Sequence, residues 1–278
     1  MCTDNKTAVT DIILGFNYFN KFKIPLFPLF LFLYILILCG NVLIIFLVSF
    51  NKHLQMPMFF FLKHVGLADV LVTTSTVPMM LHIILNEEII ITLVGCICQL
   101  CISALSSVQC LLLAVMSYDR YIAVCFPLHY ISVMSPNVCL LLVVGCWLSV
   151  FVFTAGEDTS VLTLVDFAYS VIIMCVPFTF IVGTYVCIFI TIFRMHSKTG
   201  KKKTFSTCSS HLTVVCTYYG TLSIVYIDPA NDNSATMKKF ISLFYIVVTP
   251  FLNPIIYSLK NKEIKETLRK YIKIQKTN

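Results

Sequence analysis

The chain of 278 residues is 58% hydrophobic and 13% aromatic, has only 12% charged residues, and has a mean hydropathy of +0.90. Soluble domains average about 25% charged residues, so this composition excludes an ordinary soluble protein and indicates a membrane protein. The net charge of +7 does not predict a nucleic-acid partner, because the basic residues cluster between and after apolar segments, where they suit a membrane surface.

Residues 1–23 are polar and mixed, and they lack the basic segment and short apolar core of a cleavable signal peptide. The first apolar segment is therefore expected to act as the insertion signal. Most Lys and Arg residues fall on the inner side if the N-terminus lies outside the cell, which predicts a cytoplasmic C-terminus. The sequon that starts at Asn5 would then face the lumen, where it can be glycosylated.

Apolar segments follow one another along the rest of the chain, and a helix needs about 20 such residues to cross the hydrocarbon core. Seven can be drawn, at residues 25–50, 58–85, 89–124, 138–155, 161–193, 209–227 and 240–259. The sequence thus predicts an all-α membrane protein, a seven-transmembrane helix bundle over 25–259. An extracellular N-terminus (1–24) precedes the bundle, and a cytoplasmic tail (260–278) follows it.

The tail alternates basic residues with Ile264, Leu268, Ile272 and Ile274. This pattern predicts a short amphipathic helix on membrane lipid of the inner leaflet, with a solvated basic tail as the alternative.

Thirteen cysteines would suggest disulfides in a secreted domain, but most of these lie within apolar segments. We expect them to be small buried hydrophobic residues. The cysteines in this group are Cys39, Cys110, Cys139, Cys146, Cys175, Cys187 and Cys216. No cysteine or histidine pattern has the spacing of a metal site, so no cofactor is expected.

Charged and helix-breaking residues within the apolar segments are the candidates for function, because they are costly in a membrane. Asp69 lies within the second segment, and its alternative role is a purely structural hydrogen bond. Asp119 and Arg120 end the third segment, where the two can pair and where Arg120 can change partners. The last segment contains Pro250, Asn253, Pro254 and Tyr257 in TPFLNPIIYSL, which predicts a kink with polar groups nearby.

These residues form a combination of motifs: DRY at 119–121, NPxxY at 253–257, an Asp in the second span and Asn41 in GNVLI of the first. Longer strings accompany them, including MSYDRYIAVCFPLHY, PMFFFL, KKTFSTCSSHLTVV and PFLNPIIYSLKNKEIKETL. With these strings the chain resembles the vertebrate olfactory (odorant) receptors, a family of rhodopsin-like (class A) G-protein-coupled receptors. The resemblance covers nearly the whole chain.

The resemblance implies a mechanism and a partner. Asp119 would restrain Arg120 in the inactive state. Arg120 would then be released toward a heterotrimeric G protein of the stimulatory olfactory type, which raises cyclic AMP. His211 would lie at the inner end of the sixth helix, which moves. The residues implied in activation are Asp119, Arg120, Tyr121, Tyr185, His211, Asn253, Pro254 and Tyr257.

The resemblance also implies a ligand pocket in the outer half of the bundle. Its wall would be mostly apolar with a few hydroxyls, which suits a small volatile odorant. The residues implied are Ile102, Ser103, Ser106, Ser107, Tyr169, Ser170, Ile173, Tyr219, Leu222, Ser223 and Tyr226. Ordinary helix packing is the alternative role for many of them.

The chain departs from the family pattern at three places. Cys96 matches a cysteine that, in the family, forms a disulfide with a cysteine in a long loop between the fourth and fifth spans. In this chain the connection between those spans is short, so the partner of Cys96 is unknown. Gln109 stands where the family has a Glu, so sodium at Asp69 should bind weakly. The segment from Cys96 to Gln109 is about one residue short, which would rotate the outer third helix by roughly 100°.

Other classes of protein are weaker alternatives. A retinal-binding light sensor needs a Lys in the last span, and residues 240–259 contain none. A channel or transporter would need a polar stripe or paired broken helices. The histidines are scattered, which does not favour an enzyme. The main prediction is a receptor in the plasma membrane. The stronger rival is a degenerate, non-signalling receptor, which lacks most of its second extracellular loop and is therefore retained in the endoplasmic reticulum.

Overall fold

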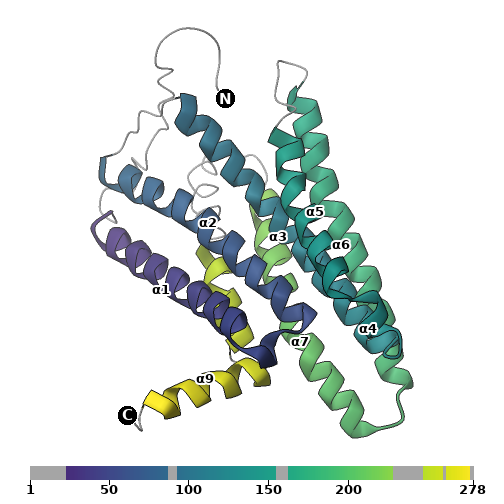
Figure 1. Cartoon of the computed structure of the whole chain (residues 1–278). Helices are drawn as coiled ribbons and strands as arrows, with labels where there is room; N and C mark the ends of the chain where they lie inside the picture. Colours follow the sequence, from purple (N-terminus) through teal and green to yellow (C-terminus); the bar gives the residue numbers. More distant parts are fainter. Residues whose placement is uncertain (1–22, 87–92, 155–161, 228–246, 259–260, 276–278) are drawn as a thin grey trace.

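The computed structural model describes residues 23–86, 93–154, 162–227, 247–258 and 261–275, and all regular structure in these ranges is helical (Figure 1). The elements are α1 (Lys23–Phe50), η2 (Lys52–Leu54), α2 (Pro57–Asn86), α3 (Leu93–Cys125), α4 (Tyr130–Val133), α5 (Pro136–Thr154), α6 (Leu162–Arg194), α7 (Lys198–Ile227), an unlabelled helix Val247–Ser258, and α9 (Lys262–Gln275). The predicted all-α bundle is confirmed.

The bundle is built around α3, which packs against α2, α5, α6 and α7, while α1 packs against α2. Buried side chains of α3, such as Leu112, Leu113 and Met116, meet Phe59 and Leu62 of α2 in the main core. This core lies toward the end of the bundle where α2 and α5 begin and α3 ends. That end also holds η2, α4 and the start of α7 (Figure 1).

Among the described residues, four helical segments are long and apolar enough to cross a membrane: Pro25–Phe50, Pro57–His82, Leu105–Cys125 and Val171–Arg194. Pro136–Ser149 and Val247–Ser258 are apolar but shorter. The sequence predicts that the sixth span begins at residue 209, whereas α7 begins at Lys198. Hydropathy detects only the part of a helix that suits hydrocarbon, so it misses the polar first turns of α7.

The cysteine prediction holds in part. Buried in the bundle are Cys110, Cys139 and Cys146. The prediction of burial is wrong for Cys39, Cys175, Cys187 and Cys216, which are exposed on the outer surface of their helices. In a bilayer this surface faces lipid, so an apolar residue there need not be covered by protein. Hydropathy alone cannot distinguish the two surroundings.

The predicted amphipathic tail helix is confirmed as α9. The Oδ1 of Asn261 accepts hydrogen bonds from the backbone N–H groups of Glu263 (3.0 Å) and Ile264 (3.4 Å), which caps the start of the helix. Ile264 is buried, whereas Lys265 and Arg269 are exposed. One face of α9 therefore packs on the bundle, and α9 contacts η2.

Candidate functional site

A buried polar network centres on Asp69 of α2. One carboxylate oxygen accepts a hydrogen bond from Nε2 of Gln109 on α3 (2.6 Å), and the other accepts one from Nδ2 of Asn253 on the last described span (2.9 Å). Asp69 is fully buried, and Gln109 and Asn253 are nearly so. Because buried polar groups are costly unless they are paired, the network ties three helices together at one depth.

The kink motif of the helix Val247–Ser258 is completed by a residue of α1. Pro254 has no N–H to donate to the carbonyl four residues earlier, which is that of Pro250. The Nδ2 of Asn41 donates to this carbonyl (3.1 Å) and also to that of Ile37 (3.0 Å). The two helices pack closely, because a Cβ at Gly40 would lie 2.9 Å from Cγ of Pro254. Asn41 thus replaces the missing helical hydrogen bond.

Asp119 and Arg120 form the expected ion pair at the end of α3. The Nη2 and Nε of Arg120 donate to Oδ2 of Asp119 at 2.7 and 3.0 Å. The hydroxyl of Tyr130, on α4, donates to the other oxygen at 2.8 Å. Burial and the neighbouring Asp119 raise the pKa of Tyr130, so its phenol stays protonated and can donate. Both oxygens of this buried carboxylate are therefore occupied.

A second contact joins α6 to α7 near the same end. The hydroxyl of Tyr185 and Nδ1 of His211 share a hydrogen bond of 2.7 Å, and the two rings are stacked. The hydroxyl of Tyr257 is buried and has no hydrogen-bond partner among the described residues. Tyr121 is half-buried, and its ring contacts those of Tyr118 and Phe126. The predicted activation residues thus lie in contacts between side chains or helices, and the hydroxyl of Tyr257 is the exception.

Only some of the predicted ligand residues have side chains that the structure describes. Five of their side chains lie outside the described set: Ile102, Ser103, Tyr169, Ser170 and Tyr226. Half-buried positions are taken by Ser106, Ser107, Ile173 and Leu222. Tyr219 is buried, and Ser223 is exposed, with its hydroxyl donating to the carbonyl of Tyr219 (2.7 Å).

Tyr219 and Ser223 line a groove of about 480 Å³ between α6 and α7. Phe178 of α6 faces Tyr219 there, with ring centroids 4.8 Å apart. Tyr185 lines the same groove, so the groove joins predicted ligand residues to a predicted activation residue. Its other walls are largely apolar.

Comparison with known proteins agrees with this geometry. Residues 40–159 match the model of the 7 transmembrane receptor (rhodopsin family), and residues 155–276 match that of the olfactory receptor family. Olfactory receptor 5P55 of Mus musculus is 38% identical over 309 residues, covering 98% of each chain. Olfactory receptor 2G3 of Homo sapiens is 41% identical over 301 residues, covering 96% of this chain and 97% of its own. The chain belongs to the olfactory receptor family. Members of this family are multi-pass membrane receptors rather than enzymes.

The comparison also bears on the short connection of this receptor. The 309 aligned positions exceed the 278 residues of the chain, so the mouse relative contains residues that this receptor lacks. The two family models meet at residues 155–159. In the structure α5 ends at Thr154 and α6 begins at Leu162, so the predicted short connection between these helices is confirmed.

Sequence reasoning also missed the contacts of two tyrosines of this receptor. Tyr130 lies in the string PLHY, but nothing in that string says that its hydroxyl reaches Asp119. Tyr218 of α7 bonds to the carbonyl of Ser106 (3.1 Å) and to the thiol of Cys110 (2.9 Å) on α3. A polar residue at helical spacing within an apolar span was the only available signal, and it does not identify a partner.

Proposed function

We propose that this receptor binds a small volatile odorant in the outer half of the bundle and activates a stimulatory G protein, which raises cyclic AMP. The observation that carries the proposal is the Asp119–Arg120 ion pair together with the hydroxyl of Tyr257, which has no partner among the described residues. A buried hydroxyl without a partner costs about 1–3 kcal/mol. A released Arg120 would satisfy it, so the two arrangements can be close in free energy.

The proposed ligand site comprises the residues named from the resemblance, with Tyr219 and Ser223 as its best-placed members. A mostly apolar wall with few hydroxyls favours a neutral ligand held by shape and one or two hydrogen bonds. We further propose an extracellular N-terminus with glycosylation at Asn5, a bundle over 25–259 and a cytoplasmic tail. Sodium would bind weakly at Asp69, because the amide of Gln109 already occupies one oxygen and adds no negative charge.

A cyclic AMP assay in cells that express the G protein tests the proposal against a panel of odorants. We expect dose-dependent responses from the wild type and none from Arg120→Ala at equal surface expression. Lys198→Ala is a matched control, because it removes a basic residue outside the ion pair. Equal responses from the wild type and Arg120→Ala would contradict the proposal.

A second candidate function is supported by the short connection between Thr154 and Leu162. A receptor that lacks most of this loop would lose a cover for its ligand site and would be retained in the endoplasmic reticulum. Surface labelling of intact cells distinguishes the two candidates. Strong labelling with odorant responses favours the signalling receptor, whereas intracellular protein without responses favours the degenerate one.

A further inference from the structure

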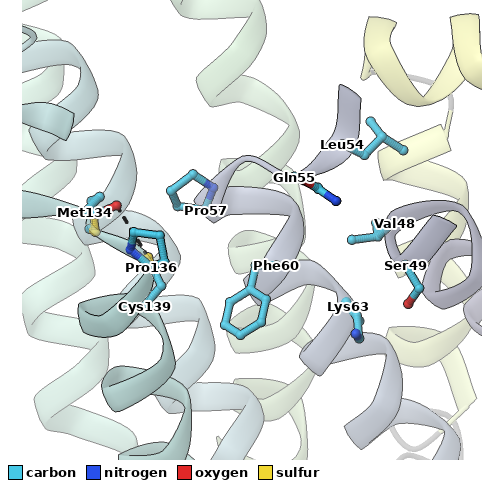
Figure 2. Close-up of a pocket in the computed structure, with 10 residues that line it drawn as sticks. All are labelled: Val48, Ser49, Leu54, Gln55, Pro57, Phe60, Lys63, Met134, Pro136 and Cys139. Atoms are coloured by element: carbon cyan, nitrogen blue, oxygen red, sulfur yellow. Dashed lines mark hydrogen bonds between the residues drawn. The ribbon is translucent and has the colours of Figure 1, made fainter. Parts of the chain in front are cut away.

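A pocket outside the proposed ligand and activation sites lies where α1 ends and where α2 and α5 begin. Its volume is about 340 Å³. Figure 2 shows Phe60 near the centre, with Pro136 and Cys139 of α5 on one side and Val48 and Ser49 of α1 on the other. The pocket therefore opens between helices at one end of the bundle.

The charge of the pocket is unbalanced. Lys63 is the one ionised side chain in the lining, where Ser49 and Gln55 are the polar side chains. Lys63 is half-buried and has no carboxylate partner among the residues that the structure describes. A positive charge without a counter-charge favours a ligand with net negative charge.

Lys63 lies in the first turns of the apolar helix α2, close enough to its start for the side chain to reach the headgroup region of a bilayer. Lys63 lies six residues after Pro57, the first residue of α2, or roughly 9 Å along the helix. A lysine at this depth can extend its ammonium group to the interface while its methylenes stay in the apolar region. The pocket thus offers a cation that can reach the headgroup level and a largely apolar wall.

The apolar wall leads toward an aromatic cluster. The ring of Phe60 lies 4.9 Å from that of His64, which lies 6.4 Å from that of Trp147 on α5. These centroid distances place the aromatic residues in a row between α2 and α5. An acyl chain that begins at Lys63 can follow this row toward the bilayer centre.

We propose that the pocket binds an anionic glycerophospholipid, whose phosphate pairs with Nζ of Lys63 and whose acyl chain lies along Phe60 toward Trp147. A zwitterionic lipid fits less well, because no acidic side chain of the lining can pair with its cationic group. The proposal requires neither an odorant nor a G protein, so it stands or fails independently of the proposed function.

Trp147 is the only tryptophan of the chain and serves as a built-in reporter. The full-length receptor is placed in nanodiscs of phosphatidylcholine that contain increasing amounts of phosphatidylserine with brominated acyl chains, which quench a nearby tryptophan. Brominated phosphatidylcholine is titrated in parallel. We expect half-maximal quenching at an about fivefold lower fraction of the anionic lipid, the size of effect expected for one basic residue near anionic lipid.

Three variants complete the test. Lys63→Gln should abolish the fivefold preference, whereas Lys52→Gln, which changes a lysine of the neighbouring η2 outside the lining, should keep it. Ser49→Phe places a ring in the pocket from an exposed position and should weaken quenching by both lipids. Equal quenching of the wild type by both lipids would overturn the proposal. So would a preference that survives Lys63→Gln, or one that Lys52→Gln removes equally.

Discussion

The two ends of the bundle differ in how their helices are connected. At the end that holds Asp119, hydrogen bonds join α3 to α4 and α6 to α7. At the opposite end, only residues 155–161 separate α5 (Pro136–Thr154) from α6 (Leu162–Arg194). The comparison teaches that the contacts proposed for signalling are present at one end, while the helices at the other end are joined by a short connection.

The largest expected effect is at Asp69, which joins three helices between the two ends. Asp69→Ala would leave the amides of Gln109 and Asn253 without their acceptor, at about 1–3 kcal/mol each. We expect a large fall in melting temperature in detergent. Asp69→Asn keeps the volume and one acceptor and should lose less. An Asp69→Ala variant as stable as the wild type would show that the network does not hold the helices together.

The next largest effect concerns the short connection between α5 and α6. Replacing residues 155–161 with a segment of family length that contains one cysteine should let Cys96 form a disulfide, with a gain of about 2–4 kcal/mol. Surface labelling and melting temperature should both increase. The same insertion combined with Cys96→Ser is the control, and an equal gain from both versions would rule out the disulfide as its cause.

A smaller loss is expected from close packing at Gly40. Gly40→Ala would place a methyl group 2.9 Å from the ring of Pro254, which costs about 1–3 kcal/mol. Gly145→Ala is the matched control, because no atom beyond its chain neighbours and the backbone of its own helix lies within 4 Å of the added methyl group. Thermal unfolding should separate the two variants. Equal melting temperatures would mean that α1 can shift without cost.

The smallest effect concerns Tyr130. Tyr130→Phe removes the hydrogen bond to Asp119 but leaves the ion pair with Arg120. A loss of about 1 kcal/mol should raise basal cyclic AMP about fivefold at equal surface expression. Tyr118→Phe, which changes the tyrosine next to Asp119 in the sequence, is a control that should alter basal activity little. Unchanged basal activity in Tyr130→Phe would show that α4 does not restrain Asp119.

Part of the site was predictable because its chemistry is local. Asp119 and Arg120 are adjacent in the chain, so an ion pair between them needs no knowledge of the fold. Pro254 also predicts a free carbonyl four residues earlier, at Pro250. The identity of the donor, Asn41, could not be predicted in this way, because Asn41 and Pro250 are 209 positions apart. Their contact depends on how α1 crosses the last span.

By itself, the sequence determined that this protein is a bundle of membrane helices with an ion pair at the end of α3 and an amphipathic final helix. Those features follow from apolar length, neighbouring charges and periodicity. The tertiary structure decided which cysteines face outward, that Gln109 and Asn253 share Asp69, and that Tyr130 reaches Asp119. The physical reason is that hydropathy reports removal from water, while helix packing decides whether a side chain meets lipid or protein.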